Sequence, residues 1–317
     1  MIPAADYVDF LAGEYLHDYV EDGGAAVKFV VPPDDPTASA FVEGFGAAAS
    51  GAGYCVAVVD AANTRVHLLE QVLFDVARQV DWDGLAASAA RGAFESAGYP
   101  APPDGSVTLD RVAAHHGVDA RELKRDVDRQ LQKQVQRDYA MVQEFRTAML
   151  RLCQAQLRSG QVVDAEHEAV LDWLRGDLRQ ISALKSALIF RRIGRHNARQ
   201  LLFSLSHWLA VQERAGLALV LDIRRLGFAR RPSPEERHGH YYTKAALLDA
   251  YEVLRQLVDN TDEMSNCIVV VVASPPFLTD RGRGLDAYQA LKLRIFDEVR
   301  DLNRDNPLSA LIRLGAA

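Results

Sequence analysis

Residues 266–277 read NCIVVVVASPPF, and this short stretch decides the fold class. One isoleucine and four consecutive valines form an uninterrupted apolar run. Such a run is typical of a central parallel strand that helices cover on both faces of its sheet. The stretch therefore predicts an α/β protein built around a buried parallel sheet.

Three other runs have the same strand-like character, at residues 26–31, 54–61 and 217–226. Amphipathic stretches with helical spacing precede or separate them, at residues 4–21, about 37–52 and 64–82. We interpret the 54–61 run as a second buried strand, and Gly51 and Gly53 as the end of the helix before it. Alternating strands and helices indicate a parallel sheet with crossover helices.

The middle of the chain differs from both ends, because residues 109–209 contain no convincing strand pattern. A loop rich in Pro and Gly at residues 97–107 leads into a long charged helical pattern at 118–157, which is broken at most once. We therefore predict a helical insertion at 97–209. It divides the α/β core into a first half at 1–96 and a second half at 210–317.

Composition narrows the function classes. The 317 residues carry a formal charge of −7, so nothing draws the whole chain towards nucleic acid. The three cysteines, Cys55, Cys153 and Cys267, lack the close spacing of zinc sites and argue against a disulfide framework. The first residues are acidic and helical in period, and no apolar run reaches membrane-spanning length. We expect a soluble cytoplasmic protein.

The ends of the predicted strands carry the residues that suggest a function. In P-loop ATPases one strand delivers the phosphate loop, a later one an acid that orders magnesium, and the next a small polar sensor. Here the strand in LVLDIRRL ends in Asp222, and the strand in VVVVASPPF has Ser274 at its tip. Together with the end of the strand at residues 26–31, these two strand ends follow one another along the chain in the order found in such an ATPase.

Segments across most of the chain resemble the AAA+ ATP-binding proteins of the BREX and phage-growth-limitation anti-phage systems. The most specific part is residues 241–295, where the family has a sensor strand ending in Ala-Thr-Pro and a Tyr-x-Ala-Leu-x-x-Arg-Ile-like pattern. The corresponding residues here are Ala273, Ser274, Pro275, Tyr288, Ala290, Leu291, Arg294 and Ile295. The resemblance implies a P-loop NTPase-like (AAA+) fold, ATP and Mg²⁺ as family cofactors, and partners encoded in a defence locus.

The chain departs from the family where nucleotide would be held. The Walker A glycines and Lys-Thr are absent from the turn, which reads Pro32, Pro33, Asp34, Asp35, Pro36, Thr37. The Walker B Asp-Glu pair becomes Asp222 and Ile223. Such ATPases usually continue after the segment that corresponds to NPLSALIRL into a lid or winged-helix domain, and we expect that this chain lacks that domain.

Physical chemistry makes the altered turn a poor phosphate site. A phosphate loop works through glycine N–H groups that point inward and a lysine that neutralises charge. Proline has no N–H, so three donors are lost, and the two aspartates repel a triphosphate by about 1 kcal/mol per close pair even in water. With Ile223 in place of the water-polarising Glu, we expect no ATP hydrolysis and no required cofactor. Nucleotide bound in a different pose remains an alternative.

An unrelated α/β protein could carry the same turn as an ordinary loop. Pro-Pro-Asp-Asp-Pro makes a stiff turn, with Asp35 or Thr37 able to cap the following helix. Whether the chain is a degenerate ATPase or an unrelated α/β protein, we expect this turn to bind no phosphate.

Other clusters give weaker signals. His238 and His240 lack a third ligand, so a solvated loop is favoured over a metal site, and His115 and His116 fit a helix end. A basic cluster contains Arg191, Arg192, Arg195, His196 and Arg199. It could contact a phosphate backbone or form an ordinary charged surface. Remnants of a subunit interface, or ordinary surface residues, are Arg281, Arg283 and Arg294.

The leading hypothesis is a catalytically degenerate AAA+-like protein that acts as a structural or regulatory partner in an anti-phage complex, as a homo- or hetero-oligomer. One alternative is an atypical ATPase whose site a partner subunit completes. Another is an adaptor that contacts DNA through the basic cluster at residues 189–200.

Overall fold

The computed structural model describes residues 1–102, 107–158, 165–212, 214–228, 239–296 and 306–315. The chain divides into two compact units. Unit 1 comprises Met1–Gln79 and Leu209–Ala317, and unit 2 comprises Val80–Trp208. The sequence placed the first boundary at residue 97, whereas helix α4 (Trp82–Ser96) belongs to unit 2.

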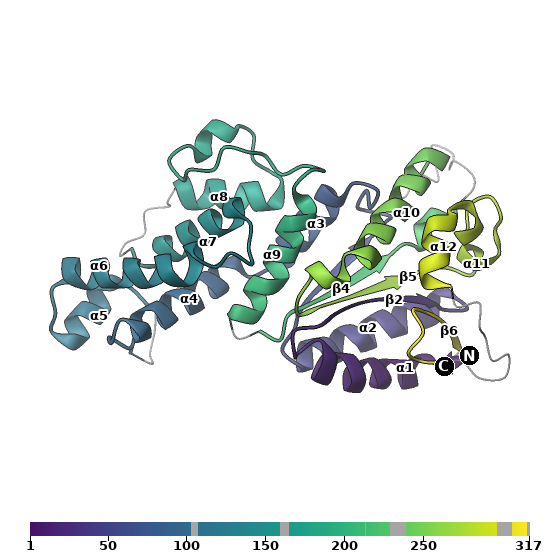
Figure 1. Ribbon diagram of the computed structural model, residues 1–317, viewed down its shortest axis with the longest axis horizontal. Helices are drawn as coiled ribbons and strands as arrows, with labels where there is room; N and C mark the ends of the chain where they lie inside the picture. The colour runs from purple at the N-terminus through teal and green to yellow at the C-terminus, as the bar shows by residue number, and fades with distance from the viewer. Residues whose placement is uncertain (103–106, 159–164, 213, 229–238, 297–305, 316–317) are drawn as a thin grey trace. The chain divides into compact units, whose positions relative to one another are not determined.

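A six-stranded sheet forms the centre of unit 1, and all its neighbouring strands run parallel (Figure 1). In spatial order the strands are β1 (Ile2–Pro3), β6 (Leu311–Gly315), β2 (Ala25–Val31), β5 (Cys267–Val272), β4 (Leu217–Asp222) and β3 (Cys55–Asp60). Strand β5 therefore separates β2, which leads into the proline-rich turn, from β4, which ends in Asp222. The predicted α/β fold class is confirmed, and the sheet is consistent with a P-loop NTPase-like fold.

The predicted central strand is β5, and every one of its residues is buried. The second predicted strand is confirmed as β3, but the prediction that it is buried was wrong, because β3 forms an edge of the sheet and Val58 is 39% exposed. The carboxamide of Gln79 accepts a hydrogen bond from Val58 N (3.0 Å) and donates one to Val58 O (3.0 Å). The Gln79 side chain thus satisfies the N–H and C=O groups of Val58, which would otherwise remain unpaired at the edge of the sheet.

Strands β1 and β6 were not predicted. β1 has two residues, and in β6 the exposed Arg313 interrupts the apolar run. The position of β6 in the sheet is given by its pairing with β2, in which Phe29 lies opposite Leu311. The composition of β6 does not reveal this pairing.

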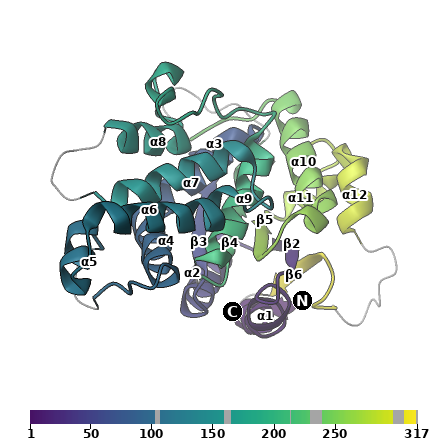
Figure 2. The same cartoon turned by 60° about the vertical axis from the view of Figure 1, so that its left-hand side comes forward.

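Helices cover both faces of the sheet (Figures 1 and 2). Helices α1 (Ala4–Leu11) and α2 (Asp35–Gly51) pack on one face, against alternate strand residues that include Val30, Val220 and Val270. On the other face Phe29 stacks on Phe277 of α11 (Pro276–Thr279), which also contacts Tyr251 of α10 (Lys244–Asp259). Helix α3 (Leu69–Gln79) packs on β3.

The first helical segment differs from the prediction of one helix over residues 4–21. Helix α1 ends at Leu11, and η1 (Ala12–Tyr19) continues with π-helical hydrogen bonding. The remaining short elements of unit 1 are η4 (Arg224–Gly227), η6 (Thr261–Glu263), η7 (Leu285–Ala287) and α12 (Gln289–Ile295).

One glycine has a steric role before β4. Gly216 has φ +141°, and a Cβ there would stand 2.0 Å from the carbonyl oxygen of Asn266. Only glycine permits this approach of two backbones.

Unit 2 is helical, and its described residues contain no strand, as predicted (Figure 2). Its elements are α4, α5 (Leu109–His116), α6 (Ala120–Leu131), η2 (Gln132–Gln136), α7 (Gln143–Gln156), α8 (Ala165–Arg175), η3 (Ile181–Leu184) and most of α9 (Ala198–Val211). The single expected break in the long charged pattern lies between η2 and α7. His115 and His116 end α5 before Gly117, as predicted.

Among the described residues, no helix combines the length and the apolar character needed to cross a bilayer.

Candidate functional site

The carboxyl ends of β2, β5 and β4 lie side by side, and this edge of the sheet is the candidate site. Val30 pairs with Val272, and Val272 pairs with Asp222, so the three ends are level. Ligands of open α/β sheets bind in the crevice outside the carboxyl ends of the strands. The structure thus brings together the proline-rich turn, Asp222 and Ser274, all of which the sequence singled out.

The turn between β2 and α2, where the sequence predicts an altered phosphate loop, is very short. Strand β2 ends at Val31 and α2 begins at Asp35, so only residues 32–34 connect them. In the P-loop motif GxxxxGK[ST], four residues separate the two glycines, and their N–H groups wrap the phosphates. A three-residue connection with two prolines cannot form that cradle.

The N-terminus of α2 is capped by Asp34, not by Asp35 or Thr37 as the sequence suggested. The Asp34 carboxylate accepts a hydrogen bond from Thr37 N (2.9 Å), and the Asp34 carbonyl accepts one from Ala38 N (3.1 Å). Hydrogen bonds from the side chain and from the backbone of Thr37 hold the pKa of Asp34 below its usual range. The N-cap position is therefore the aspartate directly before the helix, which is the preferred arrangement.

This cap takes the donors that helix N-termini offer to phosphate groups. Of the first four residues of α2, Pro36 has no N–H, and the N–H groups of Thr37 and Ala38 bond to Asp34. The helix end is thus occupied by a carboxylate of its own chain.

Arg224 joins the two acidic positions of the site. Its Nε lies 3.0 Å from both carboxylate oxygens of Asp222, and its Nη2 lies 2.6 Å from Oδ2. Its Nη1 donates to Asp35 Oδ1 at 2.6 Å. One guanidinium therefore bridges the end of β4 and the start of α2.

The charges at this bridge compensate each other. The Asp222 residue is only 8% exposed, and Arg224 supplies the counter-charge that a buried carboxylate requires. Hydrogen bonds to Asp222 raise the pKa of Arg224, so the guanidinium stays charged. Both oxygens that would order magnesium in a Walker B strand are engaged by Arg224.

Sequence reasoning missed Arg224, although it stands two residues after Asp222 in LVLDIRRL. A basic residue two positions beyond a strand-terminal acid was the available signal. Its bond to Asp35 joins residues 189 positions apart, and no local pattern reveals that contact.

The position of the Walker B glutamate lies inside the core. Ile223 is 2% exposed, and its N–H donates to Val272 O at 2.8 Å. Ser274, the sensor candidate, lies against the backbone of η4, since a Cβ on Gly227 would stand 3.1 Å from Ser274 Oγ. The end of β4 and the segment after β5 therefore provide the Asp222 carboxylate, already paired with Arg224, and the Ser274 hydroxyl.

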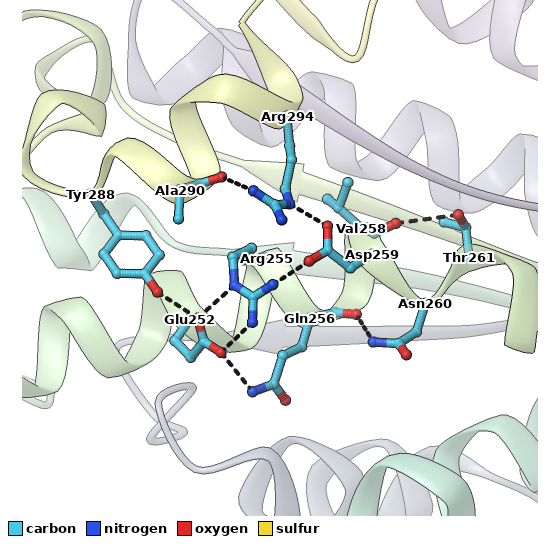
Figure 3. A network of polar contacts seen from close by, with 10 residues as sticks. All are labelled: Glu252, Arg255, Gln256, Val258, Asp259, Asn260, Thr261, Tyr288, Ala290 and Arg294. Atoms are coloured by element: carbon cyan, nitrogen blue, oxygen red, sulfur yellow. Dashed lines mark hydrogen bonds and ion pairs between the residues drawn. The ribbon is translucent and has the colours of Figure 1, made fainter.

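A second arginine network joins α10 to α12 (Figure 3). Glu252 accepts from Arg255 Nε (2.7 Å), Arg255 Nη2 (2.6 Å) and Tyr288 Oη (2.5 Å). Asp259 pairs with both Arg255 and Arg294. Hydrogen bonding from Arg255 lowers the pKa of Glu252 to about 2.

This network explains the residues that carried the family resemblance. Tyr288 and Arg294 are its α12-side members, while Leu291 and Ile295 are buried beneath them. The Tyr-x-Ala-Leu-x-x-Arg-Ile pattern thus describes a helix that is packed and hydrogen-bonded onto its neighbour.

The other predicted interface arginines have different surroundings. Arg283 donates to the carbonyl oxygens of Leu226 (3.0 Å) and Tyr242 (2.8 Å), so it holds two loops together. Arg281 is exposed.

His240 contacts Asn63 O at 3.0 Å, whereas His238 lies outside the described residues. No cluster of metal-binding side chains occurs among the residues that the structure describes.

A separate cavity of about 410 Å³ adjoins β2 on the α1 face. Its lining includes Lys28, which is only 4% exposed. The Lys28 Nζ donates a hydrogen bond to Leu308 O at 2.7 Å and lies 4.5 Å from the centre of the Tyr15 ring. Burial lowers the pKa of Lys28 to about 8. Sequence reasoning treated Lys28 only as part of a core strand.

The sheet and its strand-end site define an α/β protein with a P-loop NTPase-like fold. The chain belongs to the family of BREX system ATP-binding proteins BrxC/D, whose family model matches residues 106–316. The matched range includes Asp222, Arg224 and Ser274 but not the turn after β2. Comparison with curated proteins and with solved structures finds no match.

Proposed function

We propose that this chain is a catalytically degenerate member of its family that serves anti-phage defence as a structural or regulatory partner of other proteins of a BREX locus. It binds partners and does not turn over ATP. The observation that carries the proposal is the Asp222–Arg224–Asp35 bridge, in which the acid that would order magnesium is paired within the chain.

The bridge performs a structural task that nucleotide performs in an active relative. Bound nucleotide and its metal connect the phosphate loop to the acidic strand. Here Arg224 makes that connection between the start of α2 and the end of β4. The core is therefore complete without a ligand and can serve as a scaffold.

We propose two separate surfaces for partner binding: one on the insertion helices of unit 2, and one on the side of α12 in unit 1 that faces away from α10. Leu293 is 70% exposed, and Arg294 remains partly exposed although it pairs with Asp259. A partner can contact the apolar side chain without breaking the network behind it.

The competing function is an atypical ATPase whose site a partner subunit completes. To separate the two, the proteins of the locus are reconstituted with wild-type chain or with Asp222→Asn, and ATP hydrolysis and complex formation are measured together. The proposal expects the same hydrolysis rate with both chains and complexes that form with or without Mg-ATP. A hydrolysis rate that falls with a folded Asp222→Asn chain would overturn it.

A further inference from the structure

A basic and aromatic surface lies in unit 2, independent of the strand-end site. Residues 175–199 contain seven Lys or Arg and one Asp, although the whole chain has a formal charge of −7. Within this segment, five residues that we call the arginine strip are all exposed: Leu188, Phe190, Arg191, Arg192 and Arg195. A local positive surface on an acidic protein favours an anionic partner.

The backbone of the strip is held in place. Trp173 Nε1 donates to Arg191 O at 2.9 Å, and the Asn197 carboxamide bonds to Gly194 N (2.8 Å) and to Arg192 O (3.2 Å). Ile189 is 1% exposed and anchors the segment in the core. The outward side chains are therefore presented by an ordered, non-helical segment.

Two large apolar side chains in the strip face solvent. Phe190 is 65% exposed and Leu188 is 61% exposed. Leu188 also has φ +62°, which a bulky residue adopts only when its surroundings impose it. An exposed ring that directly precedes two exposed arginines in the sequence supplies the two kinds of group with which proteins stack unpaired bases and neutralise their phosphates.

The arginines remain available to a ligand. Arg191 lies 3.7 Å from Glu144, but its side chain is 72% exposed. Arg192 donates to the backbone carbonyl of Arg179, so this contact does not neutralise its charge. Arg199, which the sequence grouped with these residues, is half-buried on α9 and its Nε is buried.

We propose that the arginine strip binds single-stranded nucleic acid, with Phe190 stacking on a base and Arg191, Arg192 and Arg195 contacting phosphates. Duplex DNA would use the arginines but not the ring, and an acidic protein segment would use the charges without a base to stack. The exposed Phe190 is what favours the single strand.

The test is fluorescence polarisation with a labelled mixed-sequence single-stranded DNA and the matching duplex, over about 50–200 mM salt. We expect tighter binding of the single strand, and for Phe190→Ala a loss of about tenfold in affinity with the salt dependence unchanged. The triple variant R191Q/R192Q/R195Q should flatten the slope of log K against log salt by about 2. Matched controls are Tyr139→Ala, which removes an 81% exposed ring, and R121Q/R125Q/R129Q, which removes three exposed charges from α6.

Any of three binding results would overturn the proposal, as would a fourth result from competition: the three are no binding to the single strand at low salt, equal effects of the strip and control variants, and an unchanged affinity of a folded Phe190→Ala chain. Displacement of the DNA by polyglutamate at equal charge would also contradict it, because that result assigns the surface to acidic protein segments. Circular dichroism checks that each variant is folded.

Discussion

Two arginine networks in unit 1 use the same chemistry for different ends. At the strand ends, Arg224 joins Asp222 and Asp35, at the edge of the sheet where this fold places its ligand. Between α10 and α12, Arg255 and Arg294 tie two surface helices together (Figure 3). We propose that the first takes the place of contacts to a ligand, whereas the second packs one helix on another.

The comparison teaches that a family pattern and a functional site can be separated in one chain. The residues of α12 that resemble the family pack this helix against α10. Tyr288 and Arg294 do so by bonding to Glu252 and Asp259. At the strand ends, where we propose that the Walker glycines and glutamate have been replaced, Arg224 pairs with Asp222. A scaffold can keep the first set of residues while the second set changes.

The largest expected effect comes from removing Arg224. Arg224→Met leaves the buried Asp222 carboxylate unpaired, so the free energy of unfolding should fall by about 3 kcal/mol. Urea denaturation of the two chains measures this loss. The double variant R224M/D222N should regain part of it, because it removes the unpaired charge.

Asp35 provides the matched control within the same bridge. Its side chain is 87% exposed, so Asp35→Ala should cost less than about 0.5 kcal/mol. Equal losses for Arg224→Met and Asp35→Ala would contradict the account, since they would show that Asp222 does not need its counter-charge.

A smaller effect, with a distinct pH dependence, is expected at the second network. Glu252 has a pKa of about 2 in the folded protein, against an ordinary value of 4.5. Its stabilising contribution is therefore fully present above pH 4.5 and is lost as the pH falls from 4.5 towards 2.

Glu252→Gln should lower the free energy of unfolding at pH 7 by about 1 kcal/mol, a discounted value because the pair is partly exposed to solvent. The difference between the wild-type and variant chains should shrink steadily below pH 4.5. A difference that stays constant down to pH 3 would mean that the carboxylate charge is not what holds α10 to α12.

A modest effect, larger than that of Asp35→Ala, is expected at the cap of α2. Asp34→Ala should lower the melting temperature slightly, whereas Asp34→Ser should retain it, because serine also caps helices. Thermal denaturation followed by circular dichroism compares the two variants. If Asp35→Ala lowered the melting temperature more than Asp34→Ala, the assignment of the cap would be wrong.

The sequence was sufficient to predict the elements that depend on local pattern. The central strand, the helical insertion and the gathering of three strand ends followed from apolar runs and their order. It was insufficient where long-range pairing decides the outcome. The edge position of β3 depends on which strands lie beside it, and β6 is short and interrupted by Arg313.

The candidate site shows the same limit. The missing glycines and glutamate were visible in the sequence, but the bridge was not, because Asp35 and Arg224 meet only after the sheet has formed. The α2 cap was assigned to the wrong residues because adjacent aspartates differ only in backbone conformation, with Asp34 extended at φ −152°.

The central claim is that the strand-end site holds an internal cation in place of nucleotide, and nucleotide binding to the purified chain tests it most directly. A ligand at a hundred times its dissociation constant would stabilise the folded chain by about 2.7 kcal/mol. The account predicts no change in the melting temperature of the wild-type chain when millimolar Mg-ATP is added. A clear rise that Asp222→Ala abolishes in a folded chain would contradict it.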